Sequence, residues 1–183
     1  MNQLTLFEME PVTRKRKPRK SHYAMLMDEA RDYVAKDKPI VDSPDEVADL
    51  LRPLVLNLKQ EVFFALLLNT RNQVIEIVEV SKGTVDKTMV HPRDVFSSAI
   101  LANAAKILVA HNHPSGDPAP SEQDLQVTEG LIMAGKILQI EVIDHIIVGH
   151  KTDSRKIDTV SLRRLGFIAQ LAELVLNLPT KKE

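Results

Sequence analysis

The stretch His111-Asn-His-Pro-Ser-Gly-Asp-Pro-Ala-Pro-Ser-Glu-Gln-Asp124 determines how we expect the rest of the chain to be arranged. It directly follows the apolar run 107–110, Ile-Leu-Val-Ala, which predicts a buried β-strand. Side chains alternate along a strand, so His111 and His113 leave the same face of the sheet. Two imidazoles on one face at the end of a strand are the beginning of a metal site.

The second half of the stretch predicts a loop followed by a helix. Residues 114–120 are rich in Pro and Gly, and a helical pattern begins at Ser121. Ser121 and Asp124 then lie one turn apart on the same helix face. The two imidazoles and the carboxylate of Asp124 form a three-ligand set for a divalent metal, with zinc (Zn2+) favoured and a fourth position left for water. The Ser-x-x-Asp spacing is also close to a capping box, which would give both residues a role in starting the helix.

Composition is typical of one ordinary folded domain with tails. The chain has 183 residues and no cysteine, which excludes disulfides and thiolate metal sites. Its net charge of −1 argues against wholesale coating of nucleic acid. No apolar run reaches the roughly 18 residues needed to span a bilayer, and the N-terminus lacks the apolar core of a signal peptide. We therefore expect a soluble cytoplasmic protein without membrane contact.

The N-terminal segment 1–22 is expected to be a disordered tail. Six of the seven residues from Arg14 to Lys20 are basic, and such a run repels itself and stays solvated. It is interpreted either as a solubilising tail or as a weak, salt-sensitive contact with DNA phosphates.

A short peptide precedes the basic run. The sequence from Gln3 through Leu4 to Leu6 and Phe7 resembles the peptide by which many bacterial DNA-maintenance proteins dock onto the polymerase sliding clamp. The three apolar side chains would fill an apolar pocket and Gln3 would supply a polar anchor. The prediction is a docking site for the bacterial sliding clamp, although so short a motif also recurs by chance.

Periodicity predicts helices that alternate with strands along the rest of the chain. Residues 23–42 are expected to be a helical linker segment, 43–178 the main domain and 179–183 a tail. Within the domain we expect helices over 44–58, 92–103, 121–134 and 161–178, and strands over 62–68, 73–81, 85–90 and 140–148, besides the strand that carries the histidines. The fold class is therefore α/β, with a mixed sheet flanked by helices and an early antiparallel hairpin.

A hydrolytic metal site also needs a general base that takes a proton from the attacking water. The sequence offers four carboxylates for this role, and periodicity does not choose among them: Glu61, Glu76, Glu79 and Asp117. His145 lies in a strand of Ile and Val and is interpreted as a buried, hydrogen-bonded histidine or a partner of a ligand.

The spacing of the stretch resembles the signature of the JAMM (MPN-plus) metalloprotease domain, His-x-His-Pro, six residues, Ser, two residues, Asp. The flanking sequence extends the match: 91–96 is His-Pro-Arg-Asp-Val-Phe, and 144–149 is Asp-His-Ile-Ile-Val-Gly. Together with these flanks, the sequence resembles the bacterial RadC family over roughly 43–166. Full-length RadC proteins usually carry an N-terminal region similar to helix-hairpin-helix modules, and the residues before Ser43 do not resemble one. The chain is thus identified as a short form of this family.

The resemblance implies a role for each matching residue. His111, His113 and Asp124 would bind zinc, Ser121 would donate a hydrogen bond to the oxyanion of a tetrahedral intermediate, and Glu61 would be the general base. The family fold is a mixed sheet between helices, similar to that of cytidine deaminases, and the family reaction is hydrolysis of a peptide or isopeptide bond.

Three functions follow from these features. The preferred one is a zinc-dependent hydrolase of the JAMM type, acting on an unknown protein or peptide substrate in a RadC-like protein linked to DNA repair or replication. The alternatives are a metal-dependent nuclease and a non-enzymatic adaptor that docks on the sliding clamp.

Overall fold

The computed structural model describes residues 20–56, 58–83 and 90–176. The clamp-like peptide, the basic run up to residue 19 and the strand expected over 85–90, apart from Val90, lie outside the described residues. The elements follow in the order α1 (His22–Asp37), α2 (Pro44–Val55), β1 (Val62–Leu68), β2 (Val74–Lys82), α3 (Pro92–Leu101), β3 (Lys106–Asn112), α4 (Glu122–Leu138), β4 (Glu141–Val148), β5 (Thr159–Ser161) and α5 (Phe167–Leu176).

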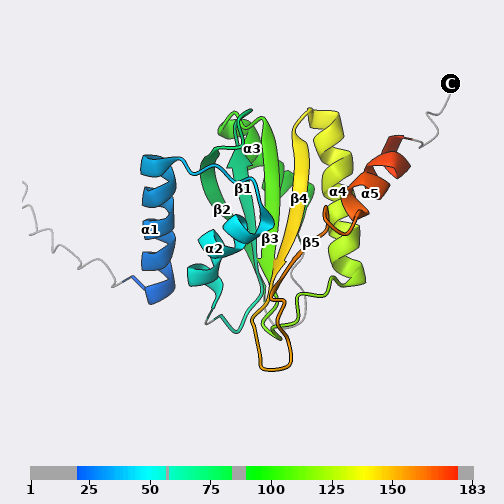
Figure 1. Cartoon of the computed structure of the whole chain (residues 1–183). Helices are drawn as coiled ribbons and strands as arrows, with labels where there is room; N and C mark the ends of the chain where they lie inside the picture. The colour runs from blue at the N-terminus through cyan, green and yellow to red at the C-terminus, as the bar shows by residue number, and fades with distance from the viewer. Residues whose placement is uncertain (1–19, 57, 84–89, 177–183) are drawn as a thin grey trace, which may run out of the picture.

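The five strands form one mixed sheet in the order β2-β1-β3-β4-β5 (Figure 1). β1 pairs antiparallel with both β2 and β3, whereas β3 and β4 are parallel and are joined through α4. The predicted α/β class, the early hairpin and the interleaving of helices with strands are thereby confirmed.

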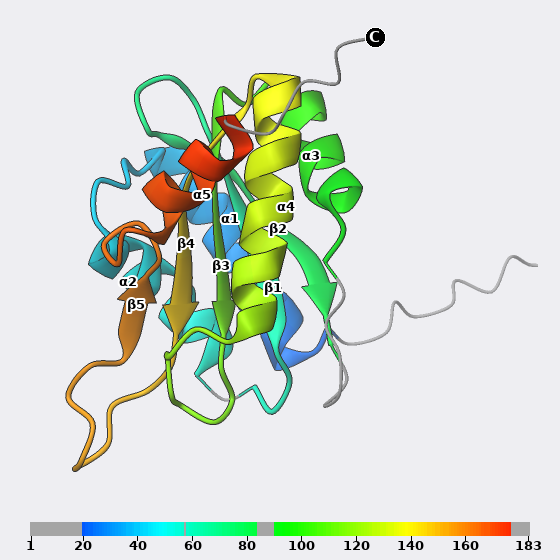
Figure 2. The same cartoon turned by 90° about the vertical axis from the view of Figure 1, so that its right-hand side faces the viewer.

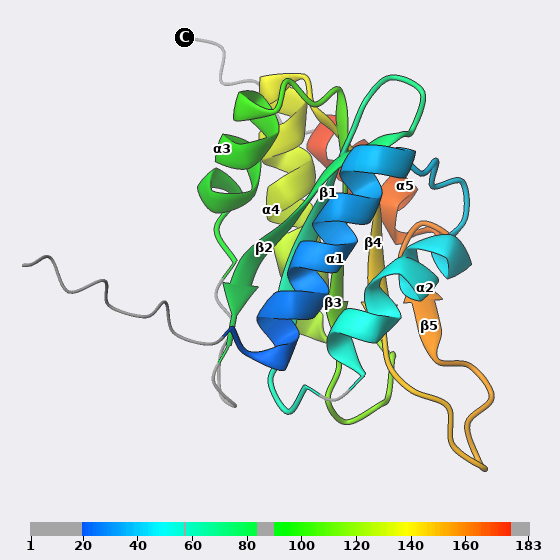
Figure 3. The same cartoon turned by 90° about the vertical axis from the view of Figure 1, so that its left-hand side faces the viewer.

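Helices cover both faces of the sheet. α1 and α2 lie over one face, as Figure 3 shows, and α3, α4 and α5 lie over the other (Figure 2). β1 is fully buried because its side chains alternate between the two layers. Phe64, Leu66 and Leu68 pack with the α1 and α2 side chains, and the odd-numbered residues of β1 pack with α3 and α4. The histidine-bearing strand β3 is therefore held at the centre of the sheet.

α1 is part of this packed structure. Its residues Met27 and Val34 are buried in the same cluster as the α2 and β1 side chains. The helix begins at a Ser21 N-cap, and its Tyr23 hydroxyl donates a hydrogen bond to Glu79 on β2. The segment named above as a helical linker thus contributes to the core.

α2 begins as its sequence predicts. Ser43 accepts a hydrogen bond from the backbone of Glu46, and the Glu46 carboxylate accepts one from the backbone of Ser43, which completes a capping box. Pro53 lies inside the helix, which continues to Val55. Among the described residues, no helix is long and apolar enough to cross a membrane.

The helix expected from Ser161 is wrong at its start. Residues 159–161 form β5, which pairs antiparallel with β4, and the chain turns before α5 begins at Phe167. Gly166 takes a φ of 85°, a conformation that favours glycine and ends the turn. Residues 159–161 therefore form a strand through hydrogen bonds with β4, although the leucines that follow have helical spacing. α4 is also longer than expected and ends at Leu138.

Candidate metal centre

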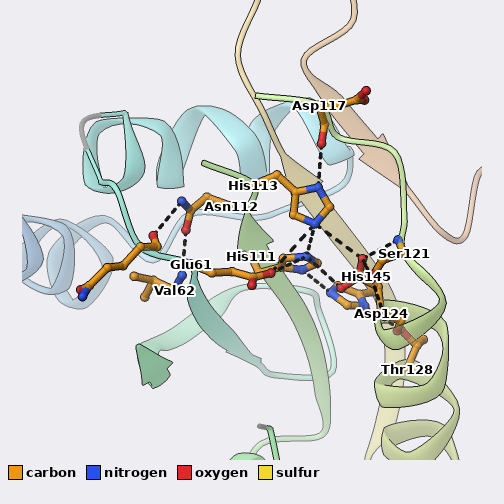
Figure 4. A network of polar contacts seen from close by, with 11 residues as sticks. Glu61, Val62, His111, Asn112, His113, Asp117, Ser121, Asp124, Thr128 and His145 are labelled. Carbon is orange, nitrogen blue, oxygen red and sulfur yellow. Dashed lines mark hydrogen bonds and ion pairs between the residues drawn. The ribbon is translucent and has the colours of Figure 1, made fainter. Parts of the chain in front are cut away.

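Strand pairing brings two distant segments to one point at the edge of the molecule. Phe63 on β1 pairs with His111 on β3, so in an antiparallel ladder Glu61 lies beside His113. The first turn of α4 carries Asp124 to the same point, where the side chains converge (Figure 4). The groups of the site therefore come from three places in the fold, the start of β1, the end of β3 and the start of α4.

The ligand atoms of four side chains lie within 4.8 Å of one another: Glu61, His111, His113 and Asp124. The Nε2 atoms of His111 and His113 are 2.9 Å apart. Asp124 reaches both histidines, with Oδ1 3.1 Å from His111 Nε2 and Oδ2 3.5 Å from His113 Nε2. Glu61 Oε1 is 3.3 Å from His111 Nε2 and 4.0 Å from His113 Nε2.

These separations fit a tetrahedral ion. Zinc bound at about 2.0–2.1 Å by nitrogen and oxygen holds neighbouring ligand atoms about 3.3 Å apart. The three distances among His111, His113 and Asp124 lie on both sides of that value, and the donor set is one that divalent transition metals accept. The residues present therefore fit a zinc ion.

Hydrogen bonding determines which nitrogen of His113 is free. Its Nδ1 lies 2.6 Å from the backbone oxygen of Asp117, and a carbonyl oxygen only accepts. Nδ1 of His113 therefore carries a proton, so Nε2, which faces His111 and Asp124, is the nitrogen that can bind a metal ion once it is unprotonated. The Asp117 side chain is turned away and contacts Arg155 at 3.3 Å.

The electrostatics of the cluster favour a bound positive charge. Burial opposes ionisation of Asp124, but its hydrogen bonds with His111 and His113 outweigh burial and hold the pKa of this carboxyl far below its ordinary value. Burial also lowers the pKa of His113, yet contacts with Asp124, the Asp117 carbonyl and Glu61 together raise it above 6.5. The group therefore attracts a cation, whether a proton or a metal ion.

A family model, described as the RadC-like JAB domain, matches residues 41–166, which include all four side chains of the cluster. The chain belongs to the RadC-like JAB domain family. This membership is compatible with a metal-dependent hydrolase, and it confirms the family resemblance drawn from 111–124 and its flanks.

Curated relatives named "UPF0758 protein" support this RadC-like assignment. One from Methanosarcina mazei is 43% identical over 136 residues, covering 74% of this chain and 57% of its own length. One from Rubrobacter xylanophilus is 49% identical over 119 residues, covering 65% and 52% respectively. One from Methanococcoides burtonii is 42% identical over 152 residues, covering 81% and 64%. The chain thus spans about half the length of the curated relatives it matches.

In this RadC-like domain Ser121 takes part in a capping box and in the cluster at once. Its hydroxyl accepts from the Asp124 backbone N–H at 3.2 Å and donates to Asp124 Oδ2 at 2.7 Å. The Ser121 backbone N–H donates to the same Oδ2 at 2.7 Å. The cap therefore orients the carboxylate toward the histidines, so the structural and ligand-orienting interpretations of this pair are compatible.

Of the four carboxylates considered as a base, Glu61 is the one that lies in the cluster. Glu79 bonds to Tyr23 beneath α1, Asp117 pairs with Arg155, and Glu76 is exposed on β2. The Glu61 side chain is 35% exposed, whereas that of His111 is 1% exposed. Glu61 therefore stands on the solvent side of the buried ligand atoms.

Two residues that hold parts of the cluster in place were not predicted from the sequence. Asn112 bonds to the backbone on either side of Glu61, and Thr128 bonds to the Asp124 carbonyl and to His145. Asn112 was overlooked because strand alternation places it on the opposite face from the histidines. Thr128 follows Asp124 by four residues, a helical spacing that could have indicated contact. It bonds to His145, whose pKa burial and the neighbouring His111 hold well below the ordinary value. The earlier interpretation of His145 as buried and hydrogen-bonded is confirmed by its contacts with His111 and Thr128.

Proposed function

We propose that this RadC-like domain is a zinc-dependent hydrolase of peptide or isopeptide bonds, acting in the cytoplasm in DNA repair or replication. The observation that carries the proposal is the pair of imidazole Nε2 atoms 2.9 Å apart, flanked by the carboxylates of Asp124 and Glu61. His111, His113 and Asp124 would hold the ion. Zinc, when bound, would supply a Lewis acid that makes water nucleophilic near neutral pH.

The chain's own groups would perform the proton transfers. Glu61, on the solvent side of the ligands, would accept the proton of the attacking water and deliver it to the leaving amine. The Ser121 hydroxyl, by rotating about its Cβ–Oγ bond, would donate to the substrate oxygen on which negative charge develops. The backbone bond from Ser121 to Asp124 would persist during that rotation and keep the carboxylate oriented.

Nuclease activity has less support. Nucleases that use two metal ions hold the ions about 3.5–4 Å apart, and they need a second set of carboxylates to bind the second ion. Within 20–56, 58–83 and 90–176, one group of three or more His, Asp or Glu side chains is close enough to hold a metal ion, and it consists of Glu61, His111, His113 and Asp124. A single mixed His and carboxylate set favours peptide hydrolysis over this alternative.

Metal analysis of the purified protein tests the proposal. We expect about one equivalent of zinc in the wild-type protein and in the control His22→Ala, because His22 is exposed at the start of α1. His111→Ala should lose the metal. A wild-type protein that takes up no zinc on loading would contradict the proposed function.

A further inference from the structure

A buried chain of hydrogen bonds links the far side of the His111 ring to the backbone of Asp124 (Figure 4). His111 Nδ1 lies 2.8 Å from His145 Nε2, and His145 Nδ1 lies 2.6 Å from Thr128 Oγ1. Thr128 Oγ1 in turn donates to the backbone oxygen of Asp124 at 2.5 Å. His145 and Thr128 are 0% exposed and His111 is 1% exposed, so water does not compete with these bonds.

The bond to the Asp124 carbonyl determines which group donates and which accepts in each of these hydrogen bonds. A backbone carbonyl oxygen accepts and never donates, so the single hydroxyl proton of Thr128 is committed to Asp124. The second contact of the Thr128 oxygen must therefore be as an acceptor. Nδ1 of His145 consequently carries a proton and donates it to Thr128.

The protonation of the His145 ring determines the direction of its bond with His111. This ring is fully buried, and its two nitrogens bond to the Thr128 hydroxyl and the His111 imidazole, neither of which is an anion that would stabilise a charged ring. Phe63 covers it edge-on, with ring centroids 5.4 Å apart. A charged imidazolium in such surroundings would be strongly disfavoured, so the ring is neutral. With Nδ1 protonated, its Nε2 accepts, and His111 Nδ1 is the donor.

We propose that Thr128 and His145 are positioning residues that fix His111 in the Nδ1–H tautomer, so that its Nε2 presents a lone pair to the metal. The inference rests on the proposed metal centre. A bond from the second nitrogen of a ligating histidine sets its tautomer and ring orientation. His113 receives this from the Asp117 carbonyl, whereas His111 receives it from a relay of two side chains.

The relay also joins two ligands that come from different elements. It starts at the backbone of Asp124 on α4 and ends on the ring of His111 on β3. Loss of the Thr128 hydroxyl would leave the buried His145 Nδ1–H without its acceptor. The His145 proton would then be better placed on Nε2, where it donates to His111 Nδ1. His111 would be left with a proton on Nε2, which blocks the ligand position.

Zinc affinity of Thr128 variants tests the relay. Thr128→Val keeps the shape and removes the hydroxyl, and it should weaken zinc binding roughly 10- to 100-fold in competition with a chelator. Thr128→Ser restores the hydroxyl and should bind close to wild type. Ser97→Ala removes a comparable helical hydroxyl, which bonds to the Asp94 carbonyl on α3, and serves as the matched control. Wild-type affinity in Thr128→Val would overturn the proposal.

Nitrogen NMR of the histidine rings provides a readout that needs neither metal nor a variant. In the metal-free wild-type protein at about pH 8, we expect His145 and His111 both to carry a proton on Nδ1. An Nδ1 without a proton on either ring would overturn the relay even if the protein binds zinc. Conversely, the expected tautomers in a protein that takes up no zinc would contradict the proposed function and leave the relay standing.

Discussion

The side-chain amide of Asn112 holds the backbone on both sides of Glu61. Asn112 Oδ1 accepts from the Val62 N–H at 2.9 Å, and its Nδ2 donates to the Gln60 carbonyl at 3.1 Å. Asn112 lies between the two histidines in sequence, but its side chain leaves the other face of β3. The end of β3 and the residue that follows it therefore carry two candidate metal ligands on one side, whereas Asn112, which places the candidate base, points to the other side.

Replacing Asn112 should destabilise the domain at this junction. Asn112→Ala leaves the Val62 N–H without its partner in a buried position, which costs about 1–3 kcal/mol of unfolding free energy. Urea denaturation measures the loss. Asn69→Ala is the matched control, because that amide also bonds to backbone N–H groups, at Arg71 and Gln73, in a more exposed turn. Equal stability losses in the two variants would refute a special role for the Asn112 bonds.

The raised pKa of His113 predicts opposite pH dependences with and without zinc. A folded-state pKa above the unfolded value of 6.5 contributes stability that is fully present below 6.5 and is lost as pH rises through the folded pKa. The metal-free domain should therefore lose this contribution as the pH rises from 6.5 through the folded-state pKa of His113. Zinc requires the unprotonated ring, so zinc affinity should rise over the same window. Thermal melts and chelator competition at several pH values measure both trends.

His113→Ala identifies the group responsible for these trends. Metal-free His113→Ala should melt with a flatter pH dependence over the window above 6.5 than the wild-type protein. His22→Ala, which removes an exposed imidazole at the start of α1, should keep the wild-type dependence. An unchanged profile in His113→Ala would assign the titration to another group.

Much of the fold follows from local signals. The run 62–68 has the length and the continuous apolar character of a strand buried on both faces, and Ser43, Pro44 and Glu46 mark the start of α2. Within the centre, local spacing also brought His111, His113 and Asp124 together, because a strand and a helix turn have fixed periods.

Non-local pairing set the limits of prediction. On residues alone Glu61 was one of four carboxylates, since its place depends on the register between β1 and β3. The β5 segment was missed for the same reason. Asp144 on β4 accepts from Ser161 Oγ at 2.6 Å and from the Arg163 N–H at 2.9 Å, and these bonds draw 159–163 to the sheet. Neither partner is visible in the local sequence.

Ser161→Ala tests how far this side chain fixes β5. Burial raises the pKa of Asp144 despite its hydrogen bonds, so each donor to this carboxyl supports a costly buried group. Loss of the Ser161 hydroxyl should lower the unfolding free energy by about 1–3 kcal/mol. Ser154→Ala, in the exposed loop that precedes β5, should change it little. Matching denaturation midpoints for Ser161→Ala and wild type would show that strand pairing alone holds β5.

Docking on the sliding clamp through Gln3 to Phe7 remains a proposal that binding measurements can test. The double variant Leu6→Ala, Phe7→Ala should lose binding to a purified bacterial clamp, because it removes two of the apolar anchors. The double variant Val12→Ala, Thr13→Ala changes two residues outside the peptide and serves as the control. Clamp binding that survives the loss of Leu6 and Phe7 would count against the peptide.

The neighbouring basic run predicts a separate, salt-dependent contact with DNA. Replacing the six basic residues of 14–20 with Gln should weaken binding to duplex DNA and flatten its dependence on salt, since fewer phosphate counterions are released. Clamp binding should be retained in that variant. DNA affinity that is independent of the run would remove it from DNA binding and leave the clamp proposal intact.

Glu61→Gln separates proton transfer from metal binding. The amide keeps the shape of the side chain but cannot accept the proton of water, so kcat should fall roughly 10²- to 10⁴-fold. Zinc content should stay at the wild-type level, because His111, His113 and Asp124 remain and Glu61 is the most exposed member of the group. The measurement is hydrolysis of a fluorogenic peptide or isopeptide that the wild-type protein cleaves, with Glu76→Gln on β2 as the matched control. Loss of zinc together with activity would make Glu61 a fourth ligand, whereas full activity would remove it from the mechanism.

Asn112 holds the backbone at Glu61, so Asn112→Ala should also lower kcat while zinc is retained. The loss of kcat should be smaller than in Glu61→Gln, because the carboxylate itself is still present.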